Sequence, residues 1–286
     1  TRLAYENWRY DTNLWRIDLA GEEPDVQAIA SSLWDVHPHI SPTGDRVAFV
    51  SNRSGSYELW TSDPDGRNAV ALSTFGGAVV GSPRWSPDGE QIVIGVRRTG
   101  PADLYLIPAS GGPARQLTDT PTDEVTASWS PDGDWIYFSS NETGSWQVWR
   151  RPSEGGPPEQ MTQSGGYAPM VAANGTLYFA RHGEAGLWQR SSSGNTSLLF
   201  PSLSVGDWGN WILTEGGIYF TNRSESLTQL EFYAFDTGRA EPVAALNPAP
   251  PRNQPSMSLS PDGRWLLVMR LDEATSDLML LDGFSL

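Results

Sequence analysis

The sequence predicts an all-β fold, a seven-bladed β-propeller of four-stranded antiparallel blades whose terminal blades are incomplete. A turn motif recurs at residues 41, 86, 130, 172, 214 and 260, so successive copies start 45, 44, 42, 42 and 46 residues apart. The 286 residues include 29 glycines and 22 prolines, which suits many short strands joined by tight turns. A four-stranded antiparallel sheet repeated at this period is the signature of a propeller blade.

Each repeat is centred on this tight turn. Regular copies read SPTG at 41–44 and SPDG at 86–89, 130–133 and 260–263, and degenerate copies read AANG at 172–175 and TEGG at 214–217. A short strand such as PRWS or ASWS precedes the turn. The aspartates of the SPDG copies are expected to cap backbone N–H groups of their own turn, which is structural chemistry rather than catalysis.

Three further strands are expected after each turn. The first is β-branched and aromatic, as in VAFV, IVIG, IYFS and LYFA, which fits a buried strand. A second strand such as ELWTSD or QVWRRP follows a polar turn, and a short outer strand such as VALS or EQMTQ completes the unit. Because a blade with two apolar faces buries both only between neighbours, the units should close into a ring. The recurring tryptophans are expected to pack between blades; they are Trp60, Trp85, Trp129, Trp149 and Trp188.

The blade count depends on the two ends of the chain. The first repeat lacks its inner strand and turn, and the last lacks its outer strand, which suggests a fragment of a longer protein. A six-bladed ring, in which the outer strand VQAIAS closes the last blade, is the alternative. Seven blades are preferred because six would leave LAYEN and LWRIDL without a blade of their own. The expected repeats, within one domain at 1–286, are 1–33, 37–73, 82–118, 127–162, 169–200, 209–246 and 256–286.

Charge and composition exclude several functions. The formal net charge is −15, from 19 Lys and Arg against 34 Asp and Glu. Nucleic-acid binding needs clustered basic residues, and anionic lipid repels an acidic surface, so neither nucleic acid nor direct membrane contact is expected. The absence of cysteine excludes disulfides, thiolate chemistry and Cys-ligated zinc. No cofactor is expected.

The regular repeats resemble those of a known family. SPRWSPDGEQIVIG and ASWSPDGDWIYFSSNETGSWQVW are similar to the PD40 repeat of TolB-like β-propellers, and the resemblance covers essentially the whole chain. It implies the fold and leaves the function open. YDTNLWRIDL, SNRSGSYELW and SDLMLLDGF look like the C-terminal propeller of bacterial CadC-like winged-helix transcriptional regulators or serine/threonine kinases. This narrower resemblance implies a sensor propeller with an effector domain upstream, in the periplasm or another extracytoplasmic space in preference to the cytoplasm.

Two histidines are candidate channel residues. His37 and His39 precede the first turn, on a strand that lines the central channel of a propeller. Residues two apart on a strand point to the same side, so the pair could hold a metal. PD40 relatives similar to oligogalacturonate lyases use channel histidines in this way, which makes a metal-dependent channel enzyme the alternative function. The third histidine, His182, lies in a different part of its repeat, so a polar channel wall is preferred and no metal site is assigned.

Residues that break the repeat are better binding candidates. The loops between the outer strand of one blade and the inner strand of the next differ from blade to blade and open onto one face. Aromatic side chains with a few charges around a channel mouth suit a peptide, a protein or a small polar ligand. No catalytic residue is assigned, and no G-x-S-x-G nucleophile elbow is present. The predicted ligand-binding residues, in a non-catalytic recognition or sensor module, are Trp34, Asp35, His37, His39, Arg84, Glu124, Asp207 and Trp208.

Overall fold

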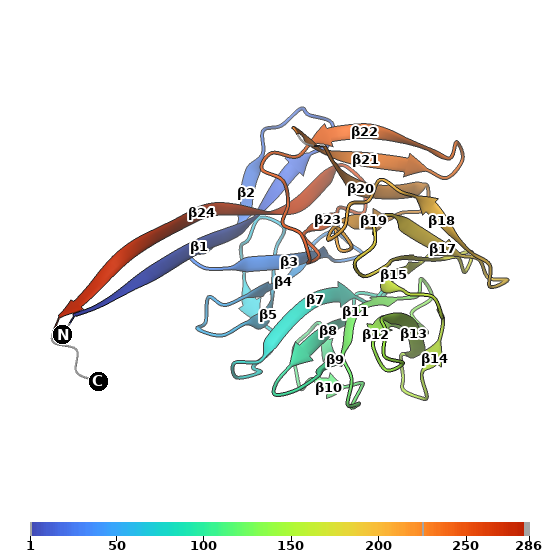
Figure 1. Cartoon of the computed structure of the whole chain (residues 1–286), viewed down its shortest axis with the longest axis horizontal. Helices are drawn as coiled ribbons and strands as arrows, with labels where there is room; N and C mark the ends of the chain where they lie inside the picture. Colours follow the sequence, from blue (N-terminus) through green and yellow to red (C-terminus); the bar gives the residue numbers. More distant parts are fainter. Residues whose placement is uncertain (1, 225, 283–286) are drawn as a thin grey trace.

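The computed structural model describes the backbone of residues 2–224 and 226–282, and the side chains of 4, 11–224, 226–272 and 279. Over these residues the chain forms 24 strands in six four-stranded antiparallel sheets, which surround a central channel as blades (Figure 1). None of the described residues belongs to a helix with the length and apolar character needed to cross a bilayer.

Five blades are each built from one continuous segment, with the strands paired in chain order from the channel outward. The first blade contains β3 (Asp35–Ile40), β4 (Val47–Ser51), β5 (Glu58–Ser62) and β6 (Val70–Ala71). The second blade contains β7 (Val79–Trp85), β8 (Gln91–Arg97), β9 (Ala102–Pro108) and β10 (Arg115–Gln116). The third blade contains β11 (Glu124–Trp129), β12 (Trp135–Ser140), β13 (Gln147–Pro152) and β14 (Glu159–Gln160). The fourth blade contains β15 (Tyr167–Val171), β16 (Leu177–Ala180), β17 (Leu187–Arg190) and β18 (Thr196–Phe200). The fifth blade contains β19 (Trp211–Leu213), β20 (Gly217–Arg223), β21 (Thr228–Ala234) and β22 (Arg239–Ala245).

The sixth blade combines both ends of the chain. Its strand order is β23 (Met257–Leu259), β24 (Trp265–Asp282), β1 (Arg2–Asp18) and β2 (Val26–Ile29). The prediction of seven blades is therefore wrong, because the first and last repeats share one blade. LWRIDL supplies its third strand and VQAI its outer strand, as in the six-bladed alternative.

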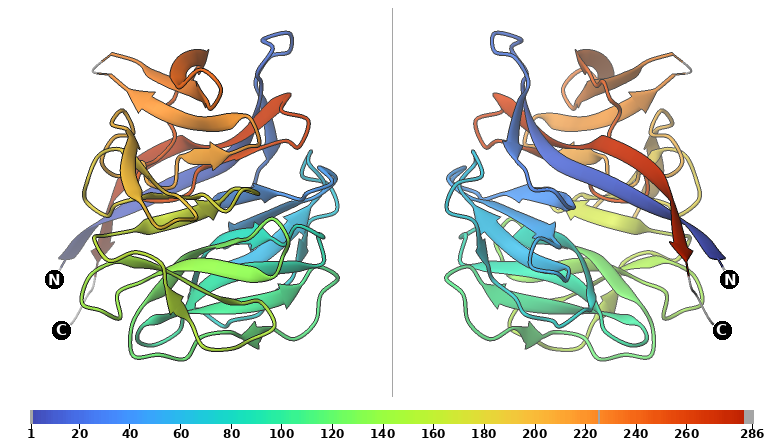
Figure 2. Two further views of the ribbon diagram at one scale, coloured as in Figure 1. Left: turned by 90° about the vertical axis from the view of Figure 1, so that its right-hand side faces the viewer. Right: turned by 90° about the vertical axis from the view of Figure 1, so that its left-hand side faces the viewer.

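The missing seventh blade is explained by two strands that do not turn back. β1 runs straight through LAYEN and LWRIDL, and β24 runs straight through WLLVMRL and DLMLLD. The two strands pair with each other from Asp18↔Trp265 to Arg2↔Asp282. Residues 2–10 and 273–282 extend from the ring as a two-stranded ribbon, here called the terminal ribbon (Figures 1 and 2). LAYEN thus has no blade of its own.

Apolar side chains fill the wedges between blades, as expected from the two-faced strands. Phe49 on β4 and Ile94 on β8 are fully buried in one cluster with Met269 on β24, so three blades share it. The recurring tryptophans pack against these clusters, and the predicted packing role is confirmed. Two indoles also join adjacent blades, since Trp85 Nε1 donates to the His39 carbonyl at 3.0 Å and Trp129 Nε1 to the Arg84 carbonyl at 3.1 Å.

The inner strands of the first four blades bulge at equivalent positions. His37, Ser82, Thr126 and Ala168 have φ of 55°, 57°, 50° and 49°. The register shifts beside each of them, in β3, β7, β11 and β15. A left-handed backbone costs a residue other than glycine on the order of 1–3 kcal/mol. A bulge re-aims the following side chains, and Ser82, Thr126 and Ala168 line the narrow part of the channel.

Candidate functional site

The central channel opens into a pocket of about 310 Å³ on the side of the SPDG turns. All six inner strands line this cavity, here called the turn-side pocket, and Pro87, Ser130 and Pro131 of the turns complete it. Most of the wall is apolar or aromatic. Its lining side chains on the inner strands are His39, Ile40, Arg84, Trp85, Ser128, Trp129, Met170, Val171, Trp211, Ile212, Leu213, Met257, Ser258 and Leu259.

Arg84 is the charged side chain of this pocket. Its Nη1 donates to the Pro83 carbonyl at 3.2 Å, and it forms no ion pair within the described part of the chain. Burial lowers the pKa of the Arg84 guanidinium to about 10, so the group stays cationic at neutral pH. In the part of the chain that the structure describes, the lining contains no carboxylate.

Backbone N–H groups determine which ring nitrogen carries the proton in His37 and in His39. The Trp85 N–H donates to His39 Nδ1 at 3.0 Å, and the Ser82 N–H to His37 Nδ1 at 3.3 Å. Each ring must therefore carry its proton on Nε2, because a neutral imidazole has one donor and one acceptor. Burial, reinforced by the Arg84 charge, lowers the pKa of His37 to about 4 and that of His39 well below its usual value.

The two histidines do not present a pair of free ring nitrogens. Their spacing of two residues predicts side chains on the same side of the strand, but the bulge at His37 interrupts this alternation of sides. His37 Nε2 lies 3.1 Å from Gln254 Oε1, which joins the first blade to the loop before β23, whereas His39 lines the turn-side pocket. Within the described residues, no group of three or more His, Cys, Asp or Glu side chains could hold a metal.

Below the turn-side pocket the channel is constricted. A cavity of only about 20 Å³ is lined by the bulge residues Ser82, Thr126 and Ala168, and by Trp208. Arg84 and Met170 line both this cavity and the pocket. Arg84 therefore stands at the inner end of the pocket.

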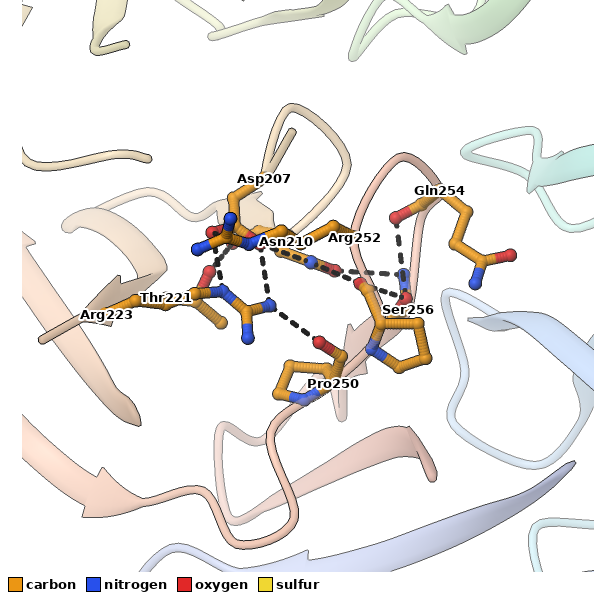
Figure 3. A network of polar contacts seen from close by, with 9 residues as sticks. Asp207, Asn210, Thr221, Arg223, Pro250, Arg252, Gln254 and Ser256 are labelled. Carbon is orange, nitrogen blue, oxygen red and sulfur yellow. Dashed lines mark hydrogen bonds and ion pairs between the residues drawn. The ribbon is translucent and has the colours of Figure 1, made fainter. Parts of the chain in front are cut away.

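The predicted residue Asp207 belongs to a buried network and not to the pocket (Figure 3). It is fully buried and pairs with Arg223 through two contacts of 2.7 and 2.8 Å. Arg223 also donates to the Pro250 carbonyl at 2.6 Å, and Asn210 donates to Asp207 at 2.9 Å and to the Pro251 carbonyl at 2.8 Å. Asp207 thus holds the loop between β22 and β23 in place.

Asp35 and Glu124 have comparable positions at the start of an inner strand. Asp35 is fully buried and pairs with Arg53 at 2.7 Å. Glu124 is buried and accepts hydrogen bonds from Thr120, Thr122 and Ser140, and burial raises the pKa of its carboxyl. Both carboxylates bind partners close to their own blade and lie outside the pocket lining.

Trp34 and Trp208 lie outside the lining of the turn-side pocket, in separate groups. Trp34 is 37% exposed and meets Tyr57 edge-on at 6.2 Å. Trp208 packs against Tyr167 at 4.9 Å, and Tyr167 in turn contacts Trp146 and His182. Of the eight predicted residues, the structure brings only His39 and Arg84 into the turn-side pocket.

Sequence reasoning missed most of the pocket wall. The repeat pattern predicts Trp85 and Trp129 as packing residues, and it does not single out Met170, Trp211 or Met257. The available signal was position: each lies on an inner strand, within three residues of the repeated turn. These residues pack between blades with one part of the side chain and line the pocket with another.

Comparison with known proteins gives the following matches. A family model described as the TolB beta propeller domain matches residues 1–204. The chain is 34% identical over 104 residues to the uncharacterized peptidase YuxL of Bacillus subtilis, which covers 34% of this chain and 15% of that protein. It is 36% identical over 96 residues to the Tol-Pal system protein TolB of Anaeromyxobacter dehalogenans, covering 31% and 20%. It is 33% identical over 94 residues to the tricorn protease homolog 1 of Streptomyces coelicolor, covering 31% and 9%. Each match spans a fifth or less of the relative's length.

Solved structures share the fold. A TolB-like protein of Agrobacterium tumefaciens superimposes with a TM-score of 0.73 at 19% identity, over 92% of this chain and 99% of that one. TolB of Acinetobacter baumannii gives a TM-score of 0.63 at 16% identity, over 93% and 65%. The tricorn protease gives 0.64 at 18% identity, over 85% of this chain and 26% of that one. At these identities the likeness concerns the fold alone.

Proposed function

Because the chain belongs to the TolB β-propeller family, we propose that it is a non-catalytic recognition module, a single domain over 1–286. Its ligand is a peptide, a protein or a small polar molecule bound in the turn-side pocket. The observation that carries this proposal is the pocket itself, an open cavity of about 310 Å³ to which all six inner strands contribute. Concave, mostly apolar sites with a few polar groups are typical of ligand binding.

The chemistry of the lining supports binding without turnover. Ser128 Oγ is buried and has no hydrogen-bond partner within the described residues, so no base activates it as a nucleophile. The lining also lacks a carboxylate that could serve as a general acid or base. Curated relatives include proteins named as peptidases as well as TolB, and this chain matches only a part of each.

A finer assignment follows from the sequence segments at the two ends and in the first blade. Their resemblance to CadC-like regulators and serine/threonine kinases supports a sensor role in a bacterial signalling or regulatory protein. On this proposal the propeller lies outside the cytoplasm, and an effector domain is attached upstream.

Selection from a peptide display library tests the recognition role. Leu213→Trp enlarges a half-buried side chain of the pocket wall, and Leu198→Trp makes the same change at an exposed leucine of β18. We expect selected peptides to lose at least tenfold in affinity with Leu213→Trp and to bind Leu198→Trp as they bind the wild type. Selected peptides that bind Leu213→Trp with wild-type affinity, or that are cleaved by the purified chain, would contradict the proposal.

A further inference from the structure

Arg84 lacks the counter-ion that three other enclosed arginines of the propeller have within the described residues. Arg53 pairs with Asp35 at 2.7 Å, and Arg223 pairs with Asp207 at the same distance. Arg270 pairs with Asp25 at 2.6 Å. For Arg84, the described residues provide a single acceptor, the Pro83 carbonyl. A guanidinium has five N–H donors, so most of its hydrogen-bonding capacity remains available.

The electrostatic surroundings of Arg84 favour an anion. The molecule carries a formal charge of −15, yet no acidic side chain among the described residues lines the turn-side pocket. An enclosed charge without a partner costs free energy, and a bound anion would remove that cost. The same removal of the guanidinium from water lowers the pKa of Arg84.

Two neutral donors flank Arg84 on the neighbouring blades. His39, Arg84 and Ser128 occupy equivalent positions of three adjacent inner strands, β3, β7 and β11, and all three line the pocket. The Trp85 N–H occupies His39 Nδ1, so His39 Nε2 carries the proton, and none of the described residues accepts it. The Ser128 hydroxyl is buried and unpartnered, in a residue that is 7% exposed.

We propose that His39, Arg84 and Ser128 form a binding site for a carboxylate whose attached apolar group packs against the pocket wall. The inference rests on the proposed recognition function and assigns the chemistry of its ligand. Arginine binds a carboxylate through two parallel N–H···O bonds, and the flanking Nε2–H and O–H groups supply further donors. One enclosed positive charge balances one negative charge, which favours a carboxylate over a dianionic phosphate. Trp85, Trp129 and Met170 provide apolar surface beside the three donors.

The test compares acids with their amides, using tryptophan fluorescence or calorimetry. N-acetyl-leucyl-phenylalanine carries a main-chain carboxylate, its amide carries none, and N-acetyl-glutamyl-phenylalaninamide carries a side-chain carboxylate. We expect at least one acid to bind tenfold or more tightly than the amide. The two acids together distinguish a peptide C-terminus from an acidic side chain as the source. Equal binding of acids and amide, or displacement by inorganic phosphate but not by acetate, would overturn the proposal.

Variants of Arg84 connect this effect to the site. Arg84→Gln should abolish the preference for acids, and Arg84→Lys should reduce it by losing the two-pronged geometry. Arg67→Gln, at a side chain that is 80% exposed, should leave it unchanged. Thermal unfolding of Arg84→Gln at or above the wild-type temperature would show that the loss is not misfolding, since an unpaired enclosed charge is removed. Wild-type acid preference in Arg84→Gln would refute the assignment.

The outcomes also separate this inference from the broader proposal. If library-selected peptides depend on Leu213 but contain no carboxylate and tolerate Arg84→Gln, only the carboxylate site is wrong. If no ligand of any chemistry depends on Leu213, the recognition function is itself wrong.

Discussion

Arg84 and Asp207 both carry charge inside the propeller, but their surroundings give them different roles. Asp207 is neutralised by Arg223 and ties two loops together, whereas Arg84 faces a pocket without a carboxylate. Burial alone does not distinguish a structural charge from a ligand-binding one. What distinguishes them is whether the charge has a partner of opposite charge. Asp207 pairs with Arg223, 16 residues further along the chain, and Asp35 pairs with Arg53, 18 residues further along.

The Asp207 network predicts a large loss of stability when its charge is removed. Asp207→Asn leaves the buried Arg223 guanidinium without its counter-ion, and breaking a buried pair costs about 3–5 kcal/mol. Urea unfolding measures the change. Glu184→Gln, which removes an exposed partner 3.5 Å from Arg181, is the control and should change stability by less than about 0.5 kcal/mol. Similar effects of the two variants would contradict a structural role for Asp207.

His37 predicts a pH dependence of stability. Its pKa is 6.5 when unperturbed and about 4 in the folded chain, where burial, Gln254 and Arg84 act on it. The unfolded chain therefore binds a proton first as pH falls, so this contribution is complete above pH 6.5 and is lost between 6.5 and 4. For a partly exposed ring we expect about 1–2 kcal/mol.

Replacing His37 by asparagine isolates this contribution. Asparagine tolerates the left-handed backbone that His37 adopts at φ 55° and does not titrate. Urea unfolding from pH 7 to 4 should show a shallower loss for His37→Asn than for the wild type. His182→Asn, which makes the same replacement at an exposed histidine, is the matched control. An unchanged slope in His37→Asn would refute the assignment.

At the level of elements, the repeated bulge shapes the channel. Four inner strands adopt left-handed backbone at residues other than glycine, and three of these residues line the narrow cavity. The periodic sequence predicted the strands but not the bulges, because histidine, serine, threonine and alanine at these positions share no turn signature. Only the register of the finished sheets reveals them.

Substitution of Ser82 tests whether this backbone stores strain. Ser82→Gly should stabilise the chain by about 0.5–1 kcal/mol, because glycine adopts φ 57° without steric cost. Ser82→Val should destabilise it by about 1–2 kcal/mol, because a β-branched residue resists this conformation. Thermal unfolding of both variants measures the difference. If Ser82→Val were more stable than Ser82→Gly, the backbone at residue 82 would not be strained.

The two straight strands β1 and β24 explain why the blade count was predicted incorrectly. In the first four blades, the turn between the second and third strands contains glycine, as in SNRSG and SNETG. The corresponding segments ENWRYDTN and RLDEATSD contain none, and both continue as extended strand. The fifth blade has no glycine between β20 and β21 and still reverses, so the absence of glycine permits a continuous strand without requiring one.

At the level of the whole molecule, the β1–β24 pair closes the ring. Residues 11–18 lie between β2 and β24 in the sixth blade, whereas residues 2–10 pair only with the other half of the terminal ribbon. A two-stranded ribbon alone adds little stability in water. Deletion of residues 1–10 should therefore lower the thermal midpoint by only about 2–4 °C.

Deletion of residues 1–18 is the contrasting variant. It removes the strand that joins β2 to the ring, and we expect loss of cooperative unfolding in calorimetry. A shorter deletion as damaging as the longer one would show that the terminal ribbon is needed for the fold.

The fold class and the blade architecture could be predicted because repetition is a property of sequence alone. The pocket could be predicted only in part. His39 was predicted from its place on a channel-lining strand and Arg84 from the equivalent position of the next repeat, but the residues of the apolar wall follow the repeat and do not stand out from it. The place where the ring closes depended on whether two segments folded back on themselves or paired with each other, and this is settled by tertiary contacts.

The continuous β1–β24 ladder also determines how the propeller responds to force. Arg2 and Asp282 face each other at the tip of the ribbon, so pulling the two ends apart loads the ladder along its hydrogen bonds. The pairs then separate one at a time, and the first 9 pairs, from Arg2↔Asp282 to Tyr10↔Ala274, open before any blade is disturbed. Tension on the ends should therefore extend the ribbon at low force and reach the ring only afterwards. A propeller of this construction has a compliant tether in series with a stiff ring.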